Sequence, residues 1–138
     1  MNKTEIMAFL KATPICFLAT TKGNKPHVRA LGLYRADEDG IILQSDKRKD
    51  LHKQLVENPE VEICFCDVKN FIEVRVSGRI EIVEDLALKK EIVEARPYVK
   101  PVVEQMGYDT IAVYRLKNGK ATFWSVKEPL APKTYVDL

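Results

Sequence analysis

The sequence lacks any hydrophobic run near the roughly 20 residues that a membrane-spanning helix requires. Residues 1–6 include Glu5 and form no apolar signal-peptide core, so we expect a cytoplasmic protein without a membrane partner. Net charge is also nearly absent, because 22 basic and 20 acidic residues leave only +2, too little for a dedicated nucleic-acid-binding surface. Aromatic residues make up 8% of the chain, which argues against stacking platforms for single-stranded nucleic acid.

Cysteine and histidine are scarce as well, which limits metal and redox chemistry. Cys16, Cys64 and Cys66 lack the C-x-x-C spacing of zinc or redox sites, so we expect three reduced thiols. Histidine as a residue type is suited to proton transfer near neutral pH, which makes His27 and His52 candidates, but such histidines are more often plain surface residues. We therefore assign no metal ligand and no catalytic residue.

The chain does have the composition of a globular protein, with 46% hydrophobic and 30% charged residues. A chain of 138 residues can bury about two-thirds of its unfolded surface in one core. We expect residues 1–138 to form a single domain.

Helices are expected in three places. The first covers residues 3–12, with Thr4 as its N-cap, and Pro14 prevents its continuation. The second ends at Asn58-Pro59, because the residue before a proline is driven out of the helical region. A helical pair extends over residues 86–107, where Pro97 and Pro101 separate its two members.

Between the helices, short apolar or alternating segments predict β-strands, and turn signals such as Asn118-Gly119 join some of them into hairpins. The tail after Lys127 is expected to be irregular. The strands are predicted at residues 15–21, 26–35, 41–44, 61–66, 71–83, 110–116 and 121–126. This order predicts a mainly β fold, an antiparallel barrel with Greek-key connections and a few short flanking α-helices.

The clearest strand covers residues 71–83, where apolar and polar side chains alternate. Gly78 lies in its middle and predicts a bend or a bulge. The strand is long enough to pair in two sheets.

A basic loop, Lys47-Arg48-Lys49, follows the third strand and opens the second helix. Cations are disfavoured at a helix N-terminus, where the macrodipole is positive, unless an anion occupies the site. The loop therefore predicts either a phosphate site or a solvated turn in which Asp46 is an ordinary N-cap. These residues alone favour the solvated turn.

Several motifs follow one another along the chain. They are Phe17-Leu18-Ala19-Thr20-Thr21, Pro26-His27-Val28-Arg29, Leu43-Gln44-Ser45 with Arg48-Lys49, Glu57-Asn58-Pro59-Glu60-Val61-Glu62-Ile63, Val74-Arg75-Val76-Ser77-Gly78-Arg79 and Phe123-Trp124. In this order and spacing they resemble the pyridoxamine phosphate oxidase-like, flavin-binding split-barrel family over nearly the whole chain. The chain is most similar to the short bacterial members that include nitroimidazole-resistance-type proteins.

The resemblance implies a split β-barrel that forms a homodimer, with FMN bound at the subunit interface. It assigns Arg29, Ala30 and Leu31 to FMN contacts in the second strand, and Gln44 and Ser45 to the ribityl and phosphate. The basic pair for the phosphate is Arg48 and Lys49, with Lys47 or Lys53 as alternatives because the loop is about two residues longer than in the oxidase. Glu73 replaces a glutamine, so its role is open, since a carboxylate donates a hydrogen bond only when protonated. Trp124 either reaches the flavin of the partner subunit or is a core or interface residue.

The chain also departs from the oxidase pattern. Ser125-Val126-Lys127 follows the tryptophan where the oxidase has an Arg-x-His element that grips its substrate, and Tyr34 replaces a substrate-phosphate lysine. We therefore expect no pyridoxamine phosphate oxidation. The resemblance implies an FMN-dependent oxidoreductase for a small molecule, such as a nitro-aromatic compound, with a nicotinamide or protein electron donor. The alternative is a non-catalytic carrier or sensor that binds a flavin, haem or deazaflavin.

Overall fold

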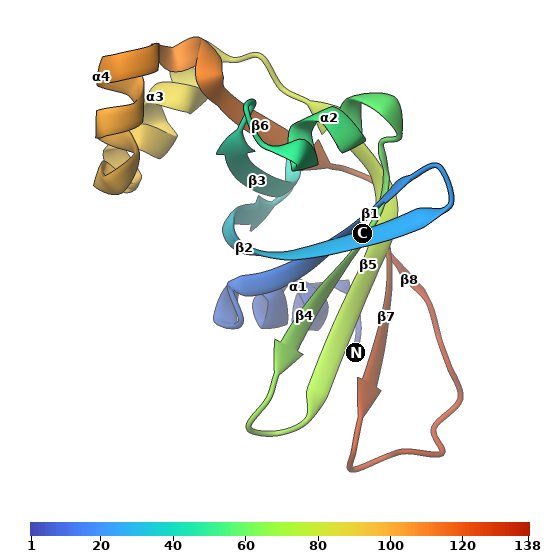
Figure 1. Ribbon diagram of the computed structural model, residues 1–138. Coiled ribbons are helices and arrows are strands. Elements are labelled where there is room, and N and C mark those ends of the chain that lie inside the picture. The colour runs from blue at the N-terminus through green and yellow to red at the C-terminus, as the bar shows by residue number, and fades with distance from the viewer.

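The computed structural model describes all 138 residues (Figure 1). The chain forms eight strands and four α-helices, with two short 3-10 helices, η1 and η2, near the helical pair. The elements are α1 (Lys3–Ala12), β1 (Ile15–Lys22), β2 (Lys25–Asp37), β3 (Gly40–Asp46), α2 (Asp50–Glu57), β4 (Glu60–Asp67), β5 (Ile72–Ile82), α3 (Leu86–Ala95), η1 (Pro97–Val99), α4 (Lys100–Met106), η2 (Tyr108–Thr110), β6 (Ile111–Leu116), β7 (Lys120–Ser125) and β8 (Val136–Asp137).

The strands pair in the order β4-β1-β2-β3-β6-β5-β7-β8, and β4 also pairs with β5, which closes six of them into an antiparallel barrel. β5 pairs with β7 over Ile72–Ser77 and with β6 over Ile80–Ile82, so the prediction that this strand serves two sheets is confirmed. Gly78 lies where the partner changes. No bulge interrupts its pairing with β4; the bulge of the barrel lies in β2 instead, between Leu33 and Arg35.

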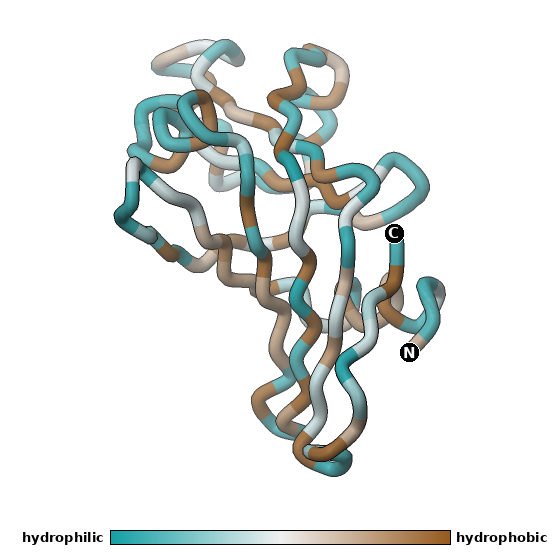
Figure 2. The backbone as a smooth tube through the Cα atoms, turned by 90° about the vertical axis from the view of Figure 1, so that its right-hand side faces the viewer, coloured by the Kyte–Doolittle hydropathy of each residue, from teal (hydrophilic) through white to brown (hydrophobic).

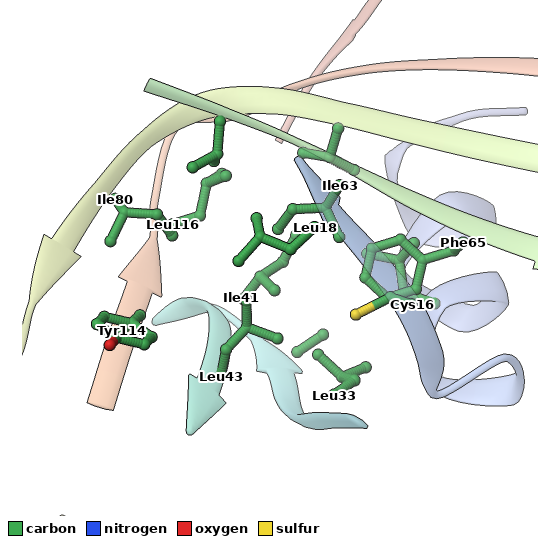
Figure 3. Packing of buried hydrophobic residues seen from close by; sticks show 14 of the residues in the cluster. Cys16, Leu18, Leu33, Ile41, Leu43, Ile63, Phe65, Ile80, Tyr114 and Leu116 are labelled. Carbon is green, nitrogen blue, oxygen red and sulfur yellow. The ribbon is translucent and has the colours of Figure 1, made fainter. Parts of the chain in front are cut away.

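Two hydrophobic clusters share strand β3, which explains its uninterrupted apolar run. Ile41 and Leu43 point into the barrel, where they pack with residues of β1, β4, β5 and β6 (Figure 3). Ile42, between them, points outward into a second cluster with Ile92 and Val99 of the α3–α4 region. The helical pair is therefore anchored on the outer face of β3 and β6, beside the basic loop (Figure 1).

The short helices differ from the predictions mainly at their first residues. Asn2, not Thr4, caps α1: its side chain accepts a hydrogen bond from the Glu5 amide at 2.9 Å, and the Glu5 carboxylate accepts one from the Asn2 amide. This reciprocal capping box places the cap two residues earlier than predicted. The tail is irregular up to residue 135, but Val136–Asp137 then pairs with β7, because the chain returns along that strand. No helix has the length and apolar character needed to cross a membrane.

β1 is apolar on both faces, but the barrel buries only one of them. Cys16 and Leu18 are fully buried, whereas Ile15 is 61% and Phe17 44% exposed. Val28 of the neighbouring β2 is 70% exposed and belongs to the same outer surface. Figure 2 shows brown segments interspersed with white and teal ones along the long strands. This surface is called the outer apolar face below and comprises Ile15, Phe17 and Val28.

Gly40 provides a stability test for the β2–β3 turn. Its φ is +101°, and a Cβ at this position would lie 2.4 Å from the Leu116 carbonyl oxygen. We expect Gly40→Ala to lower the free energy of unfolding by at least about 2 kcal/mol, since strain and a backbone clash combine. Gly23→Ala is the matched control, because Gly23 also has a positive φ but has open space around it; about 1 kcal/mol is expected there. Urea unfolding measures the free energy of unfolding of both variants, and equal losses would contradict the expected clash at Gly40.

Candidate functional site

A cavity of about 340 Å³ opens where β2, the end of β3, the basic loop and the α3–α4 region meet. Its wall includes five of the nine residues assigned to the cofactor from the sequence: Ala30, Leu31, Gln44, Ser45 and Lys49. The rest of its wall comes from β2, β3, β6 and the helical pair. These residues are Gly32, Asp46, Arg96, Tyr98, Val99, Val102 and Ile111.

Asp46 at the end of β3 is not the N-cap of α2. Its carboxylate accepts hydrogen bonds from the Arg48 side chain, with Nη2 at 2.6 Å and Nε at 3.0 Å, and from the Arg48 amide. The hydrogen bond from the Arg48 side chain lowers the pKa of Asp46 to about 2, although burial opposes the shift. Arg48 is thereby committed to Asp46 and does not line the cavity.

The helix begins at Asp50 with Lys49 as its N-cap, and no side chain caps its first turn. Uncapped amide groups at a helix N-terminus form a ready anion site. Of the four cations considered for the phosphate, Lys47 pairs with Glu84 at 2.6 Å and Lys53 lies 3.9 Å from Asp50. Lys49 has no acidic partner, and it alone of the four lines the cavity.

Ser45 lines the cavity, but its side chain follows the barrel-facing side of β3. It pairs in register with Ala112, which belongs with Leu43 to the barrel cluster. The residue is 3% exposed, and its Oγ makes no hydrogen bond within the chain. The groups that fit a phosphate-bearing ligand are therefore Lys49 and the uncapped first turn of α2.

Arg96 is the main cavity residue that the sequence did not reveal. Its Nη1 donates to Gln44 Oε1 at 3.1 Å, and its Nη2 donates to the Leu33 carbonyl at 2.9 Å. The guanidinium also stacks over the Tyr34 ring, with 5.3 Å to the ring centroid. No carboxylate pairs with it, so the cavity has a second uncompensated cation, which is held against β2 and β3. No local pattern marks Arg96, because its partners lie 52 and 63 residues away.

Arg29 lies next to the cavity wall but turns its side chain under α2. Its Nη1 donates to Thr20 Oγ1 at 2.8 Å and to the Leu18 carbonyl at 3.2 Å, and its Nη2 donates to Gln54 Oε1 at 2.6 Å. Burial lowers the pKa of the Arg29 guanidinium from its ordinary value. The residue does not line the cavity in this conformation.

Glu73 and Trp124 face each other across the β5–β7 pair, at a second cavity of about 160 Å³. Arg75 and Lys133 also line it, and the two cavities share no residue. Within one chain the structure therefore does not bring Glu73 and Trp124 to the other predicted site residues. Trp124 remains 44% exposed on the outside of the barrel.

His52 contacts the buried end of the barrel from α2. Its Nδ1 lies 2.9 Å from the hydroxyl of Tyr114, which is fully buried. Burial and then the nearby Lys47 lower the pKa of His52, while Glu84 opposes the shift. The imidazole is thus kept neutral as a structural partner of Tyr114.

The lowered pKa of His52 predicts a pH-dependent stability. Because the unfolded chain takes up the proton first, the free energy of unfolding should fall as the pH drops below about 6.5 and level off below the folded pKa. In His52→Asn, the side-chain oxygen keeps an acceptor for Tyr114, so this variant should lose less stability between pH 7 and pH 5. Urea unfolding at several pH values measures the difference, with His27→Asn as control for the loss of one histidine. Parallel curves for wild type and His52→Asn would contradict the prediction.

The three thiols are free, and Cys16 lies in the barrel interior. Burial raises the pKa of Cys16 to about 11 and also raises that of Cys64. Both are therefore protonated and weakly reactive near neutral pH.

Known structures share this fold. A NimC/NimA family protein from Clostridium acetobutylicum is 27% identical and superposes with a TM-score of 0.78, over 98% of this chain and 91% of that one. A pyridoxamine 5'-phosphate oxidase-related, FMN-binding protein from Nostoc punctiforme is 14% identical, with a TM-score of 0.68 over 99% and 96%. PhzG from Burkholderia lata, in complex with tetrahydrophenazine-1-carboxylic acid, is 12% identical, with a TM-score of 0.72 over 98% and 89%.

At the sequence level, no curated protein is significantly similar to the chain. The profile of the pyridoxamine 5'-phosphate oxidase family, in contrast, matches residues 3–125, which include every helix and strand from α1 to β7. The chain therefore belongs to the pyridoxamine 5'-phosphate oxidase family.

Proposed function

We propose that the protein binds FMN in the cavity between β2, β3 and the α3–α4 region and acts as an FMN-dependent oxidoreductase. The observation that carries this proposal is the unpaired Lys49 at the uncapped start of α2, at the wall of the cavity. A phosphate dianion would satisfy the cation and the amide groups together. A relative of the same fold is described as FMN-binding, which supports the choice of ligand.

In this proposal Lys49 and the first turn of α2 hold the phosphate, and Gln44 and Ser45 contact the ribityl chain. The backbone of Ala30 and Leu31 lines the isoalloxazine. Bound FMN supplies the hydride-transfer chemistry, while the chain binds and orients the reactants. Arg96, the second uncompensated cation, favours an electron-poor acceptor with an electronegative group, such as a nitro-aromatic compound, and a nicotinamide serves as donor.

The proposal includes a homodimer, because one chain leaves the site incomplete. Glu73 and Trp124 lie at a separate cavity, so they can contact the flavin only from a second copy. The outer apolar face supplies the surface for that contact: Phe17 pairs in register with Ala30 of the cavity wall on one side and with Cys64 on the other. Burying exposed Ile15, Phe17 and Val28 against a second copy would remove apolar surface from water.

The visible spectrum of the purified protein tests the proposal. Protein purified with its ligand, or incubated with FMN and then desalted, should be yellow and show the two absorbance bands of oxidised flavin. A colourless protein that retains no added FMN would overturn it.

A carrier or sensor role is the second candidate, and one feature of the cavity favours it. No histidine or cysteine lines the wall, and its one carboxylate, Asp46, is bound to Arg48. Steady-state oxidation of NADH or NADPH with nitro-aromatic acceptors discriminates the two, since a carrier of flavin, haem or deazaflavin would not turn over.

A further inference from the structure

Two buried polar residues and the half-buried Arg29 tie the cavity strand β2 to helix α2. Thr20 and Gln54 are 2% and 7% exposed, and the Thr20 hydroxyl donates to Gln54 Oε1 at 2.6 Å. The Arg29 guanidinium donates to both of them, at 2.8 Å and 2.6 Å. The three side chains therefore form a closed triangle of hydrogen bonds beneath α2.

Thr20 and Gln54 carry no negative charge, so the triangle does not neutralise the positive charge of Arg29. An arginine only donates hydrogen bonds, so the amide of Gln54 must turn its oxygen toward the guanidinium. This oxygen satisfies the donor as a carboxylate would, but it carries no formal charge. No acidic side chain forms an ion pair with Arg29, in contrast to Arg35, Arg48, Arg75, Arg79 and Arg115.

The position of the triangle connects it to the cavity. Arg29 directly precedes Ala30 of the cavity wall, and Gln54 lies on the short helix whose first turn presents Lys49. A positive charge held beneath this helix adds to the field at its N-terminus, where an anion would bind.

We propose that Gln54, assisted by Thr20, is a positioning residue that holds Arg29 as a fixed, uncompensated charge for the ligand's phosphate. This inference rests on the proposed function, because it assumes a phosphate at the start of α2. It assigns Gln54 an electrostatic role: a neutral acceptor is required at this position, and an acidic one would cancel the charge that the site uses.

Gln54→Glu tests the inference, because it keeps the shape and the acceptor but adds a negative charge beside Arg29. Titration with FMN and with riboflavin, which lacks the phosphate, isolates the contribution of the phosphate. We expect FMN affinity to fall about tenfold or more, while riboflavin affinity changes less than about twofold. Gln54→Met removes the acceptor but keeps the charge of Arg29, so a smaller loss that is still specific for FMN is expected.

Asn58→Asp is the matched control. It makes the same amide-to-carboxylate change at the other end of α2, where Asn58 bonds to Thr21 at 2.7 Å and not to Arg29. It should leave the ratio of FMN to riboflavin affinity unchanged. If Gln54→Glu fails to fold, as shown by circular dichroism, Gln54→Met and Thr20→Val test the same ratio, and both should reduce it.

The outcomes separate this inference from the proposed function. A wild type that prefers FMN to riboflavin, with Gln54 variants that retain the full preference or lose both flavins equally, would overturn the positioning role alone. A wild type that binds neither flavin would overturn the proposed function and this inference with it.

Discussion

Lys49→Ala is expected to weaken FMN binding by about 10- to 100-fold and to change riboflavin binding by less than about twofold. Lys49 lines the cavity, has no acidic partner and lies at the N-cap of α2. A charge-assisted hydrogen bond to a phosphate contributes about 1.5–3 kcal/mol, which corresponds to this range. Quenching of flavin fluorescence during titration measures both affinities.

Arg48→Ala is the matched control at the neighbouring position. Its guanidinium is committed to Asp46, so its removal should lower FMN affinity by less than about threefold. The structure thus separates two residues that the sequence treats as one basic pair. Equal losses of FMN and riboflavin in Lys49→Ala, or a larger loss in Arg48→Ala, would contradict the phosphate assignment to Lys49.

Phe17→Asp is expected to convert a homodimer into monomers and to lower FMN affinity as a consequence. The Phe17 side chain is 44% exposed at the centre of the outer apolar face, between Ala30 and Cys64. A carboxylate buried without a partner costs several kcal/mol, so the dissociation constant of the dimer should rise at least about 100-fold. Loss of the second copy would also remove Trp124 from the flavin site.

Analytical ultracentrifugation measures the oligomeric state, and flavin titration of the same samples measures the affinity. Leu86→Asp is the control, since Leu86 is also an exposed apolar residue, at 53%, but begins α3 away from the outer apolar face. It should leave the dimer intact. A wild type that is monomeric at all concentrations, or a Phe17→Asp variant that remains dimeric, would contradict the proposed interface.

Local patterns predicted the barrel well, because the alternation or the apolar run that marks a strand lies within a few consecutive residues. The alternation in β5 gave its length, its two faces and its double pairing, each of which the structure confirms. The run Ile41-Ile42-Leu43 predicted a strand, and the structure explains its continuous apolar character, because two separate clusters bury its two faces. A bend or a bulge was predicted at Gly78. Its pairing with β4 is uninterrupted, and the bulge lies near Leu33 instead, because a glycine marks a conformational freedom and not its use.

Local patterns predicted the residues of the site less completely. Ala30, Leu31, Gln44, Ser45 and Lys49 lie in one cavity, as their assignment requires, although their contacts with a cofactor stay a prediction. Arg96 was not predicted, because its hydrogen bonds run from the end of α3 to β2 and β3. No residue near it in the sequence indicates these contacts. Glu73 and Trp124 fall outside the cavity of their own chain, so their assignment depends on a second copy.

The basic loop illustrates what the sequence determines and what only the tertiary structure decides. By itself, the sequence determined that several cations gather at the start of a helix, which favoured a solvated turn over an anion site. The fold distinguishes the cations, because it places Asp46 against Arg48, Glu84 against Lys47 and no carboxylate against Lys49. The physical reason is that an ionic partner is chosen by distance in space, and Glu84 reaches Lys47 because the ends of β3 and β5 lie on either side of β6.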